Sequence, residues 1–554
     1  MNDFEYQLGF VIDSAWRMVE MQDRNRLSPS YGCFHYAYWR DKTSEFPDSR
    51  FQEAGAALGL LALPRFDEAR AAGTLPEAGI LYSCFAAGIQ FWESSQYPEG
   101  CWDEWYKGER GFAATEFPMI AYGLAARYMR DSIKAEDHER LVSTMRKAGD
   151  WLAARDDRVK ANHEAAAAAA LALAWETTGI ETFRTAAQEK MADTLSRQTE
   201  EGWFPEIGGM DLGYCSVLLD YVMVYVLVTN DTGPIAAMKR LVEFMIPHIH
   251  PDATISPESG LCLNPIVSRL GIGLLSQHGD ENAAAIVETF THSSPGRRGL
   301  TPYLADDLRL MRWSYLPIIT AMELETFRPA AGPESLSARY PEGWTIRDKS
   351  AVASYHAGSL HVYFSIAGGG AVRIFDGHKL VCEDIGINSI EADKNWGSAG
   401  YSLNRPILLT GNGTGFETAM GEAAFFYPGF LSRLVLRLGS TTPLFSRLLR
   451  QLIDRYRIKN GTAINQSAAP LAANNASYIF TRNVSVDAES VSITDRIERR
   501  NGLIHSESLQ SEIRLDGDTP PPFDEPFAAA TVTIMKRLRI DGTQPAFSSQ
   551  IEHC

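Results

Sequence analysis

The chain has 554 residues, of which 45% are hydrophobic and 22% charged, and its formal net charge is −17 at pH 7. This length exceeds what one hydrophobic core usually supports, so we predict two domains. The acidic balance argues against a nucleic-acid partner, which binds a basic face, but it leaves room for a local basic pocket.

Two further features of the sequence bear on the cellular location of the protein. No uninterrupted apolar stretch reaches the roughly eighteen residues of a membrane span, so we predict no membrane segment. The residues from Met1 to Tyr6 lack the apolar core of a secretory signal, and the seven cysteines include no CxxC pair. We therefore expect reduced thiols and a cytoplasmic location, unless a signal has been removed.

Residues 1–328 have the composition and spacing of helices. Alanine is frequent, and apolar residues recur at helical spacing, for example at Leu141, Met145, Ala148 and Leu152. Three loops between these helices resemble each other, because a glycine followed by cysteine or tryptophan occurs at Gly32, Gly100 and Gly202. Repeated helix pairs predict a solenoid or a closed toroid. We expect an α/α toroid, an incomplete barrel of helical hairpins.

One helix of this region has clear end signals. Asn162-His163-Glu164 precedes a run of alanines at residues 165–170, and Gly179 follows its last residues. Asn162 suits the N-cap position, Glu164 complements the positive end of the helix, and Gly179 suits the C-terminal stop.

The period of the sequence changes after a linker at residues 329–345, which begins Pro329-Ala-Ala-Gly-Pro. Residues 359–366 and 484–495 alternate between apolar and polar, and glycine-rich turns separate such segments. We predict an antiparallel β-sandwich over residues 346–554, interrupted by a helix between Leu431 and Tyr456.

Two segments of the helical region carry the chemistry. Asn162-His163 stands at a helix start, and a glycine- and aromatic-rich loop at residues 202–213 leads to Tyr214. This arrangement resembles the heparinase II/III-like polysaccharide lyases, most closely their alginate and oligoalginate lyases. The resemblance implies β-elimination of a uronate-containing polysaccharide or oligosaccharide. It implies that Tyr214 is base and acid and that Asn162 and His163 donate to the substrate carboxylate, and we expect Arg269 and His356 to assist.

The residue types suit this reaction. Charge develops on the carboxylate when the neighbouring carbon loses its proton, so an amide and an imidazole can stabilise it as an oxyanion hole does. A free tyrosine has a pKa near 10, and nearby cations would lower that pKa and make Tyr214 a competent base. Arg269 and Arg110 are the arginines that we expect to supply this charge or grip the carboxylate.

The chain departs from the family at one point, because it has no His-Gly-His segment beside a metal-binding aspartate. His356 and His361 are the histidines nearest that place. The ligand types between His248 and Asp252 lack an ordered spacing. We therefore expect neither a metal ion nor a cofactor.

Other interpretations of these residues remain open. Asn162 suits a simple helix cap equally well, His163 suits a structural role, and Tyr214 suits a packing role. The aromatic loop residues suit either stacking on sugar rings or packing between loops: Trp102, Trp105 and Trp203. Carboxylates in the same loops, Glu104 and Glu206, would instead suit a glycoside hydrolase. A uronate C5-epimerase and a non-catalytic glycan-binding protein are the remaining alternatives.

Overall fold

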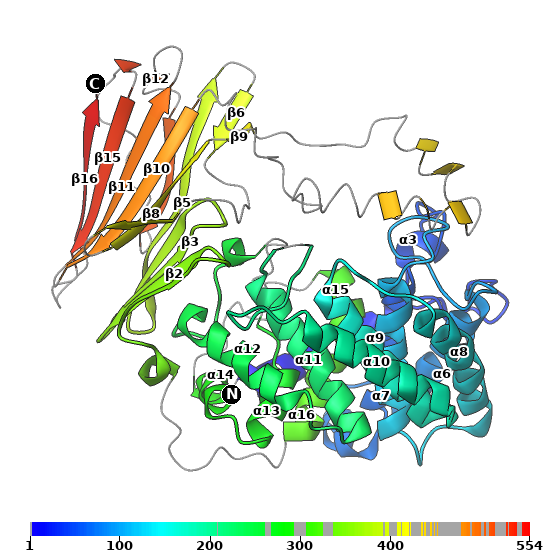
Figure 1. The fold of residues 1–554 in the computed structure, drawn as a ribbon. Helices are drawn as coiled ribbons and strands as arrows, with labels where there is room; N and C mark the ends of the chain where they lie inside the picture. The colour runs from blue at the N-terminus through cyan, green and yellow to red at the C-terminus, as the bar shows by residue number, and fades with distance from the viewer. Residues whose placement is uncertain are drawn as a thin grey trace.

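The computed structural model describes most of the chain (Figure 1). The residues outside the description are 1–2, 208, 261–266, 293–305, 325–335, 392–393, 398–406, 411–412, 420, 423–433, 436, 439–443, 446–447, 449–450, 453–477, 488–489, 500–503, 506–508, 516–527, 530, 540–545 and 554. Helices fill the chain up to Leu324, and strands begin at Gly343.

Among the described helices, six contact one another in a closed series, each touching the next and the last touching the first. In this order they are α4 (Glu53–Leu61), α7 (Ala113–Tyr128), α9 (Ala161–Thr178), α11 (Leu212–Thr229), α13 (Leu270–Gln277) and α16 (Tyr315–Leu324). A second set packs against them: α6 (Ala78–Ser94), α8 (Ala135–Ala153), α10 (Glu181–Ser196), α12 (Ile235–Met245) and α14 (Glu281–His292). The remaining helices are α1 (Asp3–Asp13), α2 (Ala15–Met21), α3 (Tyr36–Trp39), α5 (Asp67–Ala71) and α15 (Asp307–Trp313), with short 3₁₀ turns η1 (Ser49–Gln52), η2 (Pro64–Phe66), η3 (Ile246–His248), η4 (Pro257–Ser259) and η5 (Leu336–Arg339).

The sequences of these helices explain their positions. In α9 every residue from Ala161 to Ala174 is buried, because a helix that is apolar or small on all sides must be surrounded by other elements. Helix α11 has a mean hydropathy of 1.7 and is long enough to cross a membrane, yet 78% of it is buried within the protein, as a core helix is. In contrast, α8 buries one face that includes Leu141, Met145, Ala148 and Leu152, as predicted.

The three similar loops adopt the same local structure. Gly32, Gly100 and Gly202 have φ values of 94°, 101° and 104°. A Cβ at these positions would lie 1.9, 2.1 and 2.7 Å from carbonyl oxygens of α6, α8 and α12, so only glycine fits. A glutamine before each loop donates a hydrogen bond to the glycine carbonyl and another to the neighbouring helix: Gln22, Gln96 and Gln198. The sequence repeat is therefore a structural repeat.

The β-strands form two large antiparallel sheets and one small pair. The first sheet has the order β1 (Gly343–Arg347), β2 (Val352–Ala357), β3 (Leu360–Ser365), β4 (Ala371–Asp376), β5 (Lys379–Glu391), β6 (Lys394–Gly397) and β9 (Gly421–Glu422), with β13 (Leu509–Leu515) paired to β5. The second has the order β16 (Ala546–His553), β15 (Thr531–Arg539), β11 (Ser490–Arg499), β10 (Tyr478–Val486), β8 (Gly413–Ala419) and β7 (Ile407–Thr410); β12 (Ile504–His505) pairs with β14 (Ala528–Ala529). Strand β3 coincides with the alternation predicted at residues 359–366.

Three sequence predictions need correction or fall largely outside the described residues. The alternation at residues 484–495 is not one strand, because β10 ends at Val486 and the Asp487 side chain accepts the Ser490 N–H (2.7 Å), which turns the chain into β11. Strand β1 starts at Gly343, inside the predicted linker, of which residues 329–335 lie outside the described chain. Most of the helix predicted from Leu431 to Tyr456 also falls outside the described residues.

The two large sheets share one hydrophobic core, to which both contribute valine, isoleucine and phenylalanine side chains. Four charged groups are buried within it. Arg482 contacts Asp495 (2.6 Å) and Asp384 (3.0 Å), and Lys536 contacts Asp384 (2.6 Å) and Asp495 (2.9 Å). Because the four residues come from β10, β11, β5 and β15, this ion cluster joins the two sheets.

The helical and β regions meet through the loops after α12 (Figure 1). Arg373 binds Glu258 with both terminal nitrogens, at 2.5 and 3.2 Å. The hydroxyl groups of Tyr340 and Tyr363 donate to the Ile249 carbonyl, at 2.7 and 3.2 Å. These bonds fix the β region against the helices.

Candidate functional site

Buried polar side chains gather where the inner helices begin. Glu116, the fourth residue of α7, lies 3.3 Å from the Nδ1 of His163, the third residue of α9. Glu206 precedes α11 and accepts the backbone N–H of Asn162 at 2.8 Å. The starts of α7, α9 and α11 therefore lie together. We call Glu116, Asp157, Lys160, Asn162, His163 and Glu206 the α9 cluster.

The start of α9 differs from the sequence prediction. The helix begins at Ala161 with Lys160 in the N-cap position, so Asn162 is its second residue and not its cap. Lys160 makes no side-chain capping bond. Carboxylates from elsewhere replace the missing cap: Glu206 binds the Asn162 N–H, and Asp157 binds the N–H groups of Val159 (2.9 Å) and Lys160 (3.0 Å). The other end matches the prediction, since Gly179 is the left-handed C-cap, at φ 71°.

The Asn162 side chain is fully buried, and neither of its polar atoms has a hydrogen-bond partner of ordinary geometry in the described structure. Its amide lies beside the Glu206 carboxyl and lowers the pKa of that group, but burial has the larger effect and raises this pKa to about 8. A buried amide without a hydrogen bond of ordinary geometry costs about 1–3 kcal/mol, a cost that the packing around Asn162 offsets.

His163 lies between two acids and one cation. Its Nδ1 is 3.3 Å from both Glu116 and Asp157, and its Nε2 is 3.4 Å from the Lys160 ammonium group. Because an ammonium group only donates, we infer that the Nε2 lone pair accepts and that the imidazole proton is on Nδ1. Burial, together with the negative charges of Asp157 and Glu164, raises the pKa of Glu116 well above its usual value.

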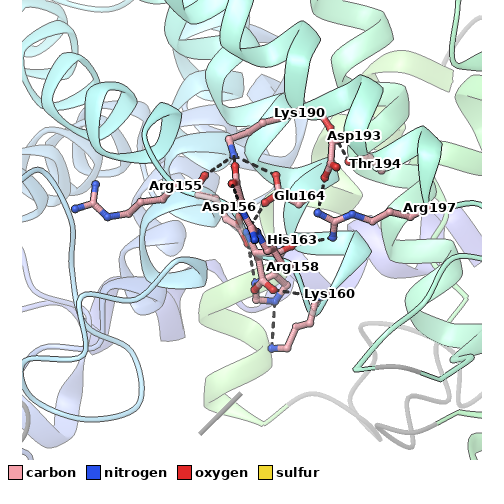
Figure 2. A network of polar contacts seen from close by, with 12 residues as sticks. Arg155, Asp156, Arg158, Lys160, His163, Glu164, Lys190, Asp193, Thr194 and Arg197 are labelled. Carbon is pink, nitrogen blue, oxygen red and sulfur yellow. Dashed lines mark hydrogen bonds and ion pairs between the residues drawn. The ribbon is translucent and has the colours of Figure 1, made fainter. Parts of the chain in front are cut away.

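Helix α10 holds the loop that leads into α9 (Figure 2). Lys190 binds Glu164 at 3.1 Å and Asp156 at 3.3 Å, and Arg197 donates to the Asp157 carbonyl at 2.8 Å. Figure 2 shows Lys160 on the opposite side of His163 from this network. The Lys160 backbone N–H is thus held by Asp157, whereas its ammonium group contacts His163 from the side away from Lys190.

Tyr214 lies at the neighbouring helix start. Asp211 caps α11 and accepts the Tyr214 N–H at 2.9 Å, and the Tyr214 side chain is half-buried. The loop before it is pinned to the α9 loop, because the Ile207 N–H donates to the Val159 carbonyl at 3.0 Å. Ile207 has φ 54°, a rare backbone conformation for a β-branched residue, and its side chain packs in the β-sheet core. The β region therefore fixes the loop around Ile207, which precedes Tyr214 and contacts the start of α9.

A second group of charges adjoins the α9 cluster. Arg50 contacts Glu53 (2.6 Å) and Glu104 (3.9 Å), and Arg312 contacts Glu104 (2.9 Å) and Asp48 (2.7 Å). Burial raises the pKa of Glu53 to about 7, against the opposing effect of Arg50. Each charged side chain of this group is therefore paired with an opposite charge of the same group.

One aromatic ring connects the two groups. The Arg50 guanidinium lies 4.0 Å from the centre of the Phe117 ring, and that ring meets His163 edge-on at 5.6 Å. The two sets of buried charges are therefore adjacent within the same end of the helical region.

The two arginines expected to grip a carboxylate have other partners. Arg269 donates to Asp3 at 2.8 Å and covers the Phe290 ring, so its contacts run to α1 and α14. Arg110 lies 3.6 Å from Glu99 and stacks on Tyr97. None of these contacts is with a residue of the α9 cluster.

His356 lies between the helical and β regions. Its Nε2 is 3.0 Å from the Pro247 carbonyl and its Nδ1 is 3.1 Å from His361, while its ring stacks on Tyr340. Burial lowers the pKa of His356 to about 3. These contacts describe a structural histidine at the interface, and its proposed assistance in catalysis has no support from them.

Two of the three tryptophans considered for sugar stacking lie in the core, which favours the packing alternative for them. Trp102 is 2% exposed, stacks on Trp92 and stands two residues after Gly100 in the repeated loop. Trp203 is 5% exposed and donates to Glu201. Trp105 differs, because its side chain is 62% exposed. Both carboxylates considered for hydrolysis are also buried: Glu104 pairs with Arg312, and Glu206 caps α9.

The described residues contain no group of three or more His, Cys, Asp or Glu side chains that would hold a metal ion. The ring nitrogens of His250 instead contact the Thr254 and Ser256 hydroxyls at 2.7 and 3.1 Å. The five cysteines within the description are free and buried: Cys33, Cys84, Cys101, Cys215 and Cys382.

Sequence reasoning missed three members of the α9 cluster. Glu116 was not singled out because α8 lies between it and His163 in the sequence. Asp157 was not singled out because it lies in the loop before α9. Lys160 had a usable signal, because it stands two residues before Asn162 and three before His163 in the sequence. A positive residue at a helix start is unfavourable for the helix dipole, which hints at another role.

Comparison with known proteins supports the fold. By sequence, the chain matches no protein-family model and none of the curated proteins. Its structure is similar to that of Streptomyces coelicolor A3 chondroitin AC lyase, solved in complex with chondroitin sulphate, with a TM-score of 0.52 and 10% identity over 99% of this chain and 71% of the lyase. A Pedobacter heparinus heparan sulfate lyase HepC mutant gives a TM-score of 0.34 and 8% identity over 85% and 75% of the two chains, too low to carry an argument. The first likeness shows a helix-rich fold with antiparallel sheets that is also found in a polysaccharide lyase.

Proposed function

We propose that this protein is a lyase that cleaves a uronate-containing polysaccharide or oligosaccharide by β-elimination. The observation that carries the proposal is the buried, unpartnered Asn162 amide, which stands beside His163 at a helix start. Tyr214 stands at the adjacent helix start, where α11 packs against α9. These are the group types needed to take a proton next to a carboxylate and to stabilise the resulting charge.

The proposed steps use the residues as follows. Asn162 donates from its amide to the substrate carboxylate as negative charge develops there, and His163 assists. Tyr214 removes the proton from the carbon next to the carboxylate and returns a proton to the leaving oxygen. The fold likeness to a chondroitin AC lyase supports this choice of reaction. We further propose that the closed helix series is an α/α toroid and that the two large sheets form a β-sandwich.

A glycoside hydrolase has less support. That reaction needs two carboxyl groups that flank an open substrate site. Glu104 and Glu206, the candidates in the aromatic loops, are engaged by other groups, since Glu104 pairs with Arg312 and Glu206 accepts the Asn162 N–H.

The test is a screen of acidic glycans for the ultraviolet absorbance of an unsaturated uronate product. We expect a signal with the unmodified protein and its loss in Tyr214→Phe. Asn162→Ala should lower kcat by about 10²–10³, the usual effect of removing one oxyanion donor. Tyr225→Phe is the matched control, since Tyr225 lies on the same helix but bonds to Asp231.

Three outcomes would contradict the proposal. Reducing ends released without absorbance would indicate hydrolysis. Exchange of the C5 proton with solvent, without chain cleavage, would indicate an epimerase on the same site. Glycan binding without turnover in any acidic glycan would indicate a binding protein.

A further inference from the structure

The cation nearest to Asn162 and His163 is Lys160, and its contacts are unusual for a partly buried charge. The Lys160 Nζ is 3.4 Å from His163 Nε2. Among the described residues, no carboxylate oxygen lies within the 4.0 Å that defines an ion pair with this group. Arg50, Lys190 and Arg312, the other buried cations nearby, all have carboxylate partners.

The acids around Lys160 form no ion pair with its ammonium group in the described structure. Glu206 and Glu116 are the carboxyl groups that feel the Lys160 charge, and burial raises the pKa of both. Burial thus favours the neutral form of both carboxyl groups. Asp157 is the remaining acid beside His163, and it contacts the Nδ1 side of the ring, opposite Lys160.

Two more features add positive potential at the same place. Lys160 precedes the first residue of α9, an 18-residue helix, whose N-terminus attracts anions. The Asn162 amide is fully buried and unpartnered two residues further along. A half-buried ammonium group without a counter-ion, next to an unused amide, calls for a negatively charged ligand.

We propose that Lys160 binds the free carboxylate of the substrate sugar, together with the Asn162 amide, and leaves His163 Nε2 when it does so. This inference rests on the proposed function and specifies it: the substrate is a sugar acid with an unesterified carboxylate. Lys160 then supplies the positive charge that Arg269 and Arg110 do not bring to this place.

The experiment changes both partners of the proposed contact. Chondroitin and mannuronate tetrasaccharides are compared with their methyl esters, which lack the negative charge. The protein variants are Lys160→Met, Lys160→Arg and the control Lys239→Met, a half-buried lysine on α12. Binding is measured by calorimetry in the Tyr214→Phe background, and kcat/KM is measured in proteins with Tyr214 intact.

We expect Lys160→Met to weaken binding of the free acid by about 10- to 100-fold, the range of one charged hydrogen bond, with little change for the ester. Lys160→Arg should recover part of the affinity, and Lys239→Met should behave as the unmodified protein. A structural role for Lys160 would lower binding of acid and ester alike, and that result would overturn the proposal. Unchanged discrimination between acid and ester in Lys160→Met would overturn it as well.

The same data separate this inference from the proposed function. If product forms but Lys160→Met discriminates normally, the lyase function stands and the role of Lys160 is wrong. If no acidic glycan yields an unsaturated product while Lys160→Met still loses affinity for the free acid, the carboxylate site stands and the lyase function is wrong.

Discussion

Replacement of Glu206 by glutamine tests whether a buried proton is held at the start of α9. Burial raises the pKa of Glu206 from 4.5 to about 8, although the Asn162 N–H opposes this shift. The folded chain therefore keeps a proton that the unfolded chain loses between these pH values. The free energy of unfolding falls as pH rises through this window, by up to about 5 kcal/mol in total at 1.36 kcal/mol per pH unit.

Glu206→Gln retains an oxygen that accepts the Asn162 N–H, but it does not ionise. Near pH 5 we expect the two proteins to differ by less than about 1 kcal/mol, because pH 5 lies only about half a unit above the unfolded-state pKa of 4.5, so ionisation stabilises the unfolded chain only slightly. At pH 8 we expect the variant to be the more stable protein by roughly 3–4 kcal/mol, within the limit set by the pKa shift. Urea unfolding followed by circular dichroism at pH 5, 6, 7 and 8 measures this difference.

Two controls sharpen the result. Other buried acids titrate equally in both proteins, so only the difference between them reports on Glu206. Glu189→Gln, at an exposed position on α10, should show no pH-dependent difference. Glu206→Ala removes the acceptor and leaves a cavity, and should cost about 2–5 kcal/mol at pH 5. A Glu206→Gln difference that is constant from pH 5 to 8 would refute the reasoning.

Three further outcomes follow from the packing. Trp102→Ala should destabilise the fold by about 3–5 kcal/mol, whereas Trp105→Ala should change stability by no more than about 0.5 kcal/mol; equal shifts in thermal midpoint would contradict their different burial. Lys536→Met leaves two buried carboxylates with one cation, so urea unfolding should show a loss of about 3–5 kcal/mol, and a neutral result would argue against the ion cluster. His356 has a pKa lowered to about 3, so below pH 6.5 the unfolded chain binds a proton that the folded chain does not. His356→Gln should therefore lose less stability between pH 6.5 and 4 than the unmodified protein, as followed by acid titration of circular dichroism.

The repeated loops were readable from the sequence because local backbone geometry requires their residues. Gly32, Gly100 and Gly202 all need positive φ and close approach to a helix, so their spacing relative to aromatic residues is visible without a structure. The same logic located Gly179 as a helix stop and the alternation of β3. The glutamines that bind the repeated loops escaped notice, since a glutamine has no local constraint that sets it apart.

The candidate site was only partly readable. Asn162, His163 and Tyr214 were identified as residues at helix starts. In the structure the loop before α11 contacts both starts, because its Glu206 accepts the Asn162 N–H and its Asp211 accepts the Tyr214 N–H. The cap of α9 was assigned wrongly, because local preference favours asparagine whereas the cap comes from Glu206 in another loop. For Trp102 the sequence left stacking on sugars and packing open, because sequence alone does not show whether an aromatic side chain in a loop faces solvent or the core.

The sequence by itself determined the helical and β regions, the repeated loops and the residue types of the proposed chemistry, because periodicity and backbone constraints act over a few neighbouring residues. Only the tertiary structure decided which charges meet. Arg269 is held by Asp3, whereas Lys160 faces His163 without a carboxylate partner in the described chain. Electrostatic partners are set by contacts between distant segments, and burial of those contacts determines whether a group carries a proton or a charge.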